Sequence, residues 1–211
     1  MSSETPIAVT VGNAFPTGKF YIIEPSFWGG GKMPGLEIAN EEKLMLPGSF
    51  IVEPPNGDPN QYPERPHLVH LPKLGAAPRD FEELASKWIV SEHLKGVFES
   101  VDPDAFAFAA CDFTQADGTP GPAYYLCNVV RTLDALDEQA SRLKIKIGDY
   151  VNGKYSSLAG GANLIFKDDV IGSAHVFRTP FADTVFCDRA LYDAVNAAHL
   201  RGVGFLDAAE C

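Results

Sequence analysis

The stretch at residues 91–98 reads Ser91-Glu92-His93-Leu94-Lys95-Gly96-Val97-Phe98 and has the pattern of a capped amphipathic helix. The hydroxyl of Ser91 can accept a hydrogen bond from a free amide group of the first helical turn. Leu94, Val97 and Phe98 fall at the spacing that places apolar side chains on one helix face. The sequence therefore predicts a helix over residues 91–99 whose apolar face joins a core.

Two β-rich segments follow this helix. In the first, Phe106, Phe108 and Ala110 occupy alternate positions on the way to Asp112, and the second spans residues 124–130. The dipeptide Asp117-Gly118 lies between the two segments and favours a tight turn. We therefore expect a β-hairpin after the helix.

The rest of the chain mixes short strands and short helices. Apolar residues at positions 81, 84, 85 and 88 have the spacing of a helix, or of a helix that runs into a strand. Asp188 is expected to cap a helix that stops before Gly202, which is followed by a last strand. Because strict alternation of strand and helix is absent, the predicted class is α+β, with a mixed, mainly antiparallel sheet and a few short helices. The other expected segments are strands at 19–23, 49–53, 67–71, 143–147 and 203–206, apolar runs at 162–166 and 174–177 around an acidic turn, and a helix-compatible segment at 132–143.

The first 75 residues differ in composition from the remainder. They hold 11 of the 16 prolines and the triple glycine at 29–31. Proline cannot donate to a sheet ladder and breaks helices, so this region is expected to be a Pro/Gly-rich, loop-rich part with short strands. Residues 79–211 are expected to form the regular α+β part. At 211 residues the chain is expected to be a single domain, 1–211.

The charge balance restricts the classes of partner. Asp and Glu number 28 against 17 for Lys and Arg, which gives a formal net charge of −11. Such a surface repels phosphate backbones and anionic lipids, so direct binding to nucleic acid or membrane is not expected. The N-terminus lacks a cationic segment followed by an apolar run, and no stretch approaches the ~20 apolar residues of a membrane-spanning helix. These features predict a cytoplasmic protein.

The sequence contains no motif for a catalytic centre, a metal or a cofactor. His67-x-x-His70 is the closest histidine pair, and no Cys or Glu set stands near it at zinc-binding spacing. The run Gly29-Gly30-Gly31-Lys32 lacks the second half of a phosphate-binding loop. Three of the four cysteines lie in apolar runs and are expected to be buried, reduced thiols, namely Cys111, Cys127 and Cys187.

Several runs in the second part of the chain form a recognisable set. They are residues 89–95, 106–108 and 124–137 with Ala140-Ser141, then 175–178, 185–191 and 201–205. This set resembles the immunity-protein family numbered eleven among the polymorphic-toxin immunity domains, and no part of residues 1–75 contributes to the resemblance. The family's usual serine before the last helix is Cys187 here, which allows a helix cap but not an identical hydrogen bond.

The resemblance implies a non-catalytic inhibitor that is made beside a toxin, often a type VI secretion effector, and binds it so that the producing cell survives. Its partner would be the cognate toxin, and an acidic inhibitor would speed the capture of a basic one. A nuclease fits this description because its nucleic-acid-binding face must be basic.

The quoted motifs are mostly core and capping residues, so they do not indicate which surface contacts the toxin. Our hypothesis is that loop-rich parts make the contact, through the aromatic side chains Phe27 and Trp28 and the acidic turns with Asp117, Asp168 and Asp169. The alternative is that Phe27 and Trp28 are core residues and that the acidic turns are merely solvated.

Two other functions stay open at this point. One is a small cytoplasmic enzyme whose site uses dispersed carboxylates and histidines, which would form a concave pocket with perturbed pKa values. The other is an adaptor that binds a basic protein of the same cell.

Overall fold

The computed structural model describes residues 18–27, 33–46, 48, 52, 54, 58–150 and 152–211. One sheet has four antiparallel strands in the order β10-β11-β1-β12. Its strand β1 comes from the N-terminal part, and the other three strands come from the C-terminal part. This sheet therefore forms only when residues 20–25 meet the segments at residues 185–188 and 203–207. The strands are β1 (Phe20–Pro25), β10 (Val176–Arg178), β11 (Val185–Asp188) and β12 (Val203–Asp207).

The second sheet has six strands in the order β2-β3-β6-β7-β5-β4. Adjacent strands in this sheet are antiparallel, except that β3 and β6 are parallel. The long hairpin of β6 and β7 forms its centre, and segments from the proline-rich region add one edge. The strands are β2 (Leu36–Ile38), β3 (His67–His70), β4 (Phe81–Leu84), β5 (Lys87–Ser91), β6 (Phe106–Thr114) and β7 (Tyr124–Val129).

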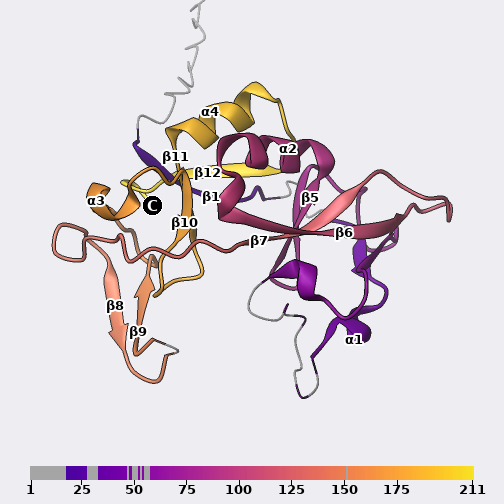
Figure 1. Ribbon diagram of the computed structural model, residues 1–211, viewed down its shortest axis with the longest axis horizontal. Helices are drawn as coiled ribbons and strands as arrows, with labels where there is room; N and C mark the ends of the chain where they lie inside the picture. The colour runs from indigo at the N-terminus through magenta and orange to yellow at the C-terminus, as the bar shows by residue number, and fades with distance from the viewer. Residues whose placement is uncertain are drawn as a thin grey trace, which may run out of the picture.

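Two helices, α2 (Glu92–Val101) and α4 (Arg189–Ala197), lie side by side above the sheets (Figure 1). Each follows a strand directly and begins at a capping side chain. The Leu94 amide donates to Ser91 Oγ at 3.2 Å, and the Ala190 amide donates to Asp188 Oδ1 at 3.0 Å. The remaining helical pieces in the described ranges are one turn long: α1 (Glu41–Leu44), α3 (Asp168–Ile171) and the 3₁₀ turns η3 (Pro59–Gln61) and η4 (Pro103–Ala105).

The largest cluster of buried side chains lies between these two helices and both sheets. Phe98 of α2 stacks on Phe106 of β6 with ring centroids 4.4 Å apart, and Tyr21 of β1 stacks on Tyr192 of α4 at the same distance. Each sheet thus supplies one part of a shared apolar core, and burial of such surface is the main driving force for folding. Other fully buried members include Ile23, Phe81, Val90, Leu94, Val176 and Leu191.

The outer face of each sheet has its own smaller core. Phe177 and Phe186 of the four-stranded sheet pack with Phe166 at centroid distances of 5.4 and 4.9 Å. On the six-stranded sheet, the buried side chain of Leu44 from α1 packs against residues that include Leu68. Coil segments therefore cover surfaces that would otherwise expose the outward-facing apolar side chains of the strands.

A two-stranded hairpin of β8 (Lys144–Ile147) and β9 (Lys154–Ser157) forms a third sheet. Figure 1 shows it extending away from the four-stranded sheet. All four residues of β8 are exposed. We call residues 144–157 the arm.

The predicted α+β class is confirmed, with mixed, mainly antiparallel sheets and short helices in the described ranges. The helix at 91–99 and the following hairpin are confirmed as α2 and β6–β7. The strands at 19–23, 67–71, 143–147 and 203–206 are confirmed within a few residues, as is the helix after Asp188. The strand expected at 49–53 falls on residues of which most lie outside the described ranges. No helix in the described part is long and apolar enough to cross a membrane.

The helix expected around residues 81–88 is wrong. This segment is the β4–β5 hairpin, in which Phe81 lies opposite Val90 and Leu84 opposite Lys87. Ala85 has a φ of 49° and Ser86 a φ of 61°, as a two-residue hairpin turn requires. Phe81 and Leu84 lie in β4, Ala85 lies in the turn and only Trp88 lies in β5, so the helical spacing of these apolar residues arises from two strands and a turn.

The segment at 132–143 is not a helix either. Its backbone forms hydrogen bonds with distant segments. The Leu133 amide donates to the Arg178 carbonyl at 2.8 Å, and the Asp137 amide donates to the Ile165 carbonyl at 2.9 Å. The apolar run at 162–166 meets this segment through single bridges and forms no strand of its own. Tertiary pairing overrides the local preference of this polar segment.

Ser91 is expected to contribute measurably to stability, because its hydroxyl caps α2 and also donates to Asp80 Oδ1 at 2.9 Å. Replacing Ser91 with Ala should lower the free energy of unfolding by about 1–2 kcal/mol in urea denaturation. The matched control is Ser100→Ala, which removes an exposed hydroxyl near the end of the same helix. An equal effect of both substitutions would contradict the capping role.

Candidate functional site

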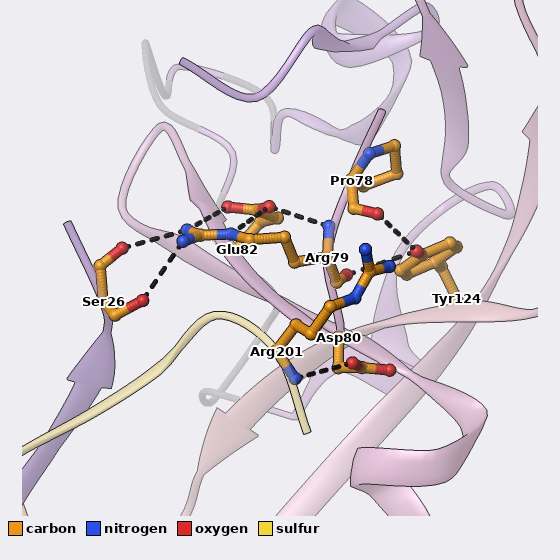
Figure 2. A network of polar contacts seen from close by, with 7 residues as sticks. All are labelled: Ser26, Pro78, Arg79, Asp80, Glu82, Tyr124 and Arg201. Atoms are coloured by element: carbon orange, nitrogen blue, oxygen red, sulfur yellow. Dashed lines mark hydrogen bonds and ion pairs between the residues drawn. The ribbon is translucent and has the colours of Figure 1, made fainter. Parts of the chain in front are cut away.

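Arg79 and Glu82 form a buried ion pair where the two sheets meet (Figure 2). The guanidinium donates to both carboxylate oxygens of Glu82 at 2.9 Å, and the Glu82 side chain is 1% exposed. The same guanidinium donates to Ser26 Oγ at 3.1 Å and to the Ser26 carbonyl at 2.9 Å. Because Ser26 directly follows β1 and Glu82 lies in β4, this pair links the four-stranded sheet to the six-stranded sheet.

Asp80 extends the same network toward the last loop. Its carboxylate accepts from the Arg201 amide at 2.8 Å and from the Ser91 hydroxyl at 2.9 Å. Gly202 follows with a φ of +91°, and a Cβ there would lie 2.5 Å from the Phe81 carbonyl oxygen. Only glycine fits this close approach of the α4–β12 loop to β4.

The buried hydroxyl of Tyr124 closes the network. It donates to the backbone carbonyls of Pro78 and Arg79, at 3.3 and 3.2 Å. Burial, together with the negative charges of Asp80 and Glu82, raises the pKa of Tyr124 to about 12. This tyrosine therefore holds its proton as a structural donor and is unsuited to act as a base near neutral pH.

A second polar junction is centred on Asp102, at the end of α2. Its buried carboxylate pairs with Arg131, which follows β7, and accepts from the amides of His175 at 2.8 Å and Val176 at 3.0 Å. The Arg131 guanidinium also donates to the Val176 carbonyl at 3.2 Å. This junction joins α2 and β7 to β10.

His175 and Asp188 are a histidine–carboxylate pair of the kind that an enzyme could use. His175 Nδ1 lies 2.8 Å from Asp188 Oδ2. The other oxygen of Asp188 caps α4, so this carboxylate is committed to the helix terminus. The described ranges contain no group of three His, Cys, Asp or Glu side chains that could hold a metal ion.

The expectation of buried thiols is confirmed for Cys111, Cys127 and Cys187, which are free and buried. Burial raises the pKa of the Cys111 thiol to about 12 and also raises the pKa values of Cys127 and Cys187. A thiol with a raised pKa is a poor nucleophile. At the departure from the family pattern, Cys187 makes core contacts and Asp188, one residue later, supplies the cap.

The aromatic candidates at the end of β1 have different outcomes. Phe27 is 92% exposed, so the alternative that it is a core residue is wrong. Trp28 lies outside the described residues. Phe27 adjoins Ser26 and the Arg79 network, which fixes the backbone from which its ring projects.

The acidic candidates are exposed but lie far apart. Asp117 accepts from the Thr119 amide at 2.9 Å at the tip of the β6–β7 hairpin, and the hydrogen bonds from Thr119 lower its pKa. Asp168 and Asp169 lie in the first turn of α3, where Asp168 pairs with Lys19 at 2.6 Å. Figure 1 shows α3 and the β6–β7 tip at opposite ends of the molecule. The structure therefore does not bring Asp117 together with Asp168 and Asp169.

Two hollows, of about 280 and 290 Å³, border the Lys19–Asp168 pair. Both are also lined by Phe20, and one reaches Asp188 and Arg189. They are open depressions beside α3, and they place the acidic turn on a contoured surface. No local pattern indicates a role for Lys19, because its contact with Asp168 joins residues 149 positions apart.

The comparison with family models identifies the class of protein. The model described as an immunity protein family (Imm11) matches residues 19–210. The chain therefore belongs to this immunity protein family. No curated protein matches the sequence at a significant level. The match includes residues 19–75, which the resemblance in the sequence did not reach, and it agrees with the central place of β1 in the four-stranded sheet.

The high pKa values of the buried thiols predict a loss of stability at alkaline pH. The Cys111 thiol has a pKa of about 12 when folded, against 9.0 for an ordinary thiol. Between these values the unfolded chain releases a proton that the folded chain keeps. The free energy of unfolding should therefore fall as the pH rises above 9, by up to about 1.4 kcal/mol per pH unit for such a group.

Below pH 9 both states keep the proton, so this group adds no pH dependence there. Urea denaturation at about pH 8 and about pH 11 checks the expectation, and Cys111→Ala should show a smaller fall than the unmodified chain. The same fall in both proteins would contradict the contribution of Cys111.

Asp102 is expected to be among the side chains most important for stability, because it satisfies two buried amides and the Arg131 charge. Replacing Asp102 with Ala should lower the free energy of unfolding by about 3 kcal/mol, since all three donors then lose their acceptor. The exposed neighbour Asp104 provides the control, because Asp104→Ala should cost about 0.5 kcal/mol or less. Similar denaturation midpoints for the two variants would disprove the junction's importance.

Proposed function

We propose that this chain is an immunity protein that binds a cognate secreted bacterial toxin in a stoichiometric complex and so neutralises it. The observation that carries the proposal is the family match over residues 19–210, nearly the whole chain. The structure is compatible with a binding protein, because the buried ion pairs Arg79–Glu82 and Arg131–Asp102 hold its two sheets together.

The toxin in this proposal carries a basic surface. The net charge of −11 would attract such a surface and speed association through long-range electrostatic steering. A nuclease delivered by type VI secretion has the required property, since its substrate-binding face must be basic. The immunity protein would then act in the cytoplasm, where an incoming nuclease meets nucleic acid.

The proposed contact residues are Phe27, Trp28, Asp117, Asp168 and Asp169. Four of them are exposed in the described ranges. Because α3 and the β6–β7 tip lie at opposite ends of the molecule, the two acidic turns offer the toxin two separate surfaces. The α3 surface has the stronger support, since two hollows border it.

Co-expression with the toxin domain encoded beside this chain tests the proposal. We expect growth to be restored and the two proteins to co-elute on size exclusion as a one-to-one complex. Restored growth without a complex would indicate an enzyme that reverses the damage, and continued toxicity would disprove immunity for that pair.

The same complex tests the acidic turn of α3. Asp168→Lys with Asp169→Lys should weaken binding by about tenfold or more, with an unchanged melting temperature, because exposed charges affect association more than folding. The matched control is Glu41→Lys with Glu42→Lys, which reverses an exposed acidic pair in the first turn of the equally short α1. Equal effects of the two double substitutions would remove α3 from the contact surface.

A further inference from the structure

The arm concentrates positive charge in an acidic protein. The arm contains three basic side chains and one acidic side chain, against 17 and 28 in the whole chain. Lys144 and Lys146 are exposed, and neither has an ion-pair partner within the described residues. The arm is thus a cationic projection from a body whose own net charge is more negative than that of the whole chain.

The strand register places these lysines on one face of the arm with an aromatic pair. Lys144 lies opposite Ser157 and Lys146 opposite Tyr155, so the four side chains point to the same side. Tyr150 stacks on Tyr155 with ring centroids 5.7 Å apart. We call Lys144, Lys146, Tyr150 and Tyr155 the cationic face.

The opposite face of the arm carries apolar side chains and the attachment to the body. Ile147 is 78% exposed and lies opposite Lys154, whose ammonium group pairs with Glu138 and sits 3.9 Å from the centre of the Phe181 ring. The Ser156 amide donates to the Phe181 carbonyl at 2.7 Å. Contacts on this side fix the base of the hairpin and leave the cationic face exposed.

One ordinary role of lysines on an exposed edge strand is to prevent aggregation through that edge. That role does not account for the two half-exposed tyrosines on the same face or for Ile147 on the opposite face, which are 41%, 36% and 78% exposed. Tyrosine provides large, stiff contact area and is enriched among the residues that dominate binding energy at protein interfaces. A cationic, aromatic hairpin therefore matches a protein surface that supplies carboxylates and an apolar recess.

We propose that the arm binds a carboxylate-lined recess on the toxin, with Lys144 and Lys146 meeting the carboxylates and Tyr150, Tyr155 and Ile147 filling the recess. This inference rests on the proposed function. The acidic body suits a basic toxin surface, but the arm cannot rest on that same surface without repulsion between like charges. It must therefore meet an acidic area within or beside the basic one.

Carboxylates grouped in a recess are characteristic of the sites where enzymes hold divalent metal ions for phosphoryl transfer. In such an enzyme the recess lies inside the basic surface that binds the phosphate backbone. An acidic body with a cationic arm complements this pattern of charge, and occupation of the recess would block the reaction directly.

Charge reversal on the arm tests the inference by calorimetric titration of the full chain with the toxin domain encoded beside it. Lys144→Glu with Lys146→Glu should weaken binding by about 30-fold or more, the size expected for residues that dominate an interface. The matched control is Lys43→Glu with Lys73→Glu, which makes the same change of net charge at exposed positions on the body. This control should bind like the unmodified chain.

A second variant tests the apolar part without changing charge. Ile147→Ala with Tyr150→Ala should weaken binding by about tenfold or more, whereas the exposed Leu74→Ala should not. Because these side chains are exposed, the melting temperatures should stay within a few degrees of the unmodified value, and circular dichroism should confirm that each variant is folded.

The outcomes separate the two proposals. Absence of binding by the unmodified chain would overturn the proposed function and the arm's role with it. Tight binding that the arm variants leave unchanged, or that they weaken only as much as their controls, would overturn the role of the arm alone. Retention of a labelled single-stranded DNA that depends on Lys144 and Lys146, without an effect of these lysines on toxin binding, would assign the arm to nucleic acid and overturn the inference.

Discussion

The buried carboxylate of Asp102 accepts hydrogen bonds from two amides that begin β10 and pairs with Arg131 beyond the end of β7. Three distant segments meet at this one side chain. A buried charge is tolerated only when its partners are all in place, so this junction forms correctly only when α2, β7 and β10 are in register. The Arg79–Glu82 pair imposes the same condition at the other meeting point of the sheets. Together they fix how the two sheets face the shared core.

This framework also explains what the family pattern represents. Ser91 caps α2, Arg131 pairs with Asp102, and Asp188 caps α4. All three lie in the runs that resemble the family, and all three hold the structure together. The residues of the family pattern named here therefore belong to the framework of the fold, because each holds a helix end or a junction between the sheets in place.

Local patterns were sufficient where an element is defined by its own residues. The α2 helix could be predicted because its cap and its apolar stripe lie within ten residues of one another. The β4–β5 hairpin could not, because its apolar residues at 81, 84, 85 and 88 have helical spacing although they are divided between two strands and a turn. The segment at 132–143 was misassigned for another reason, since its hydrogen-bond partners lie around residues 163–178.

The sequence alone determined the α+β class, the two capped helices, the central hairpin, the buried thiols and the membership suggested by the family motifs. These properties depend on short-range spacing, composition and charge, which a chain displays before it folds. The exposure of Phe27, the position of Asp117 and Asp168 at opposite ends of the molecule, and the face that Lys144 and Lys146 share with two tyrosines become evident only in the folded chain. Exposure and proximity between distant residues are set by how the sheets pack, and no local pattern encodes that packing.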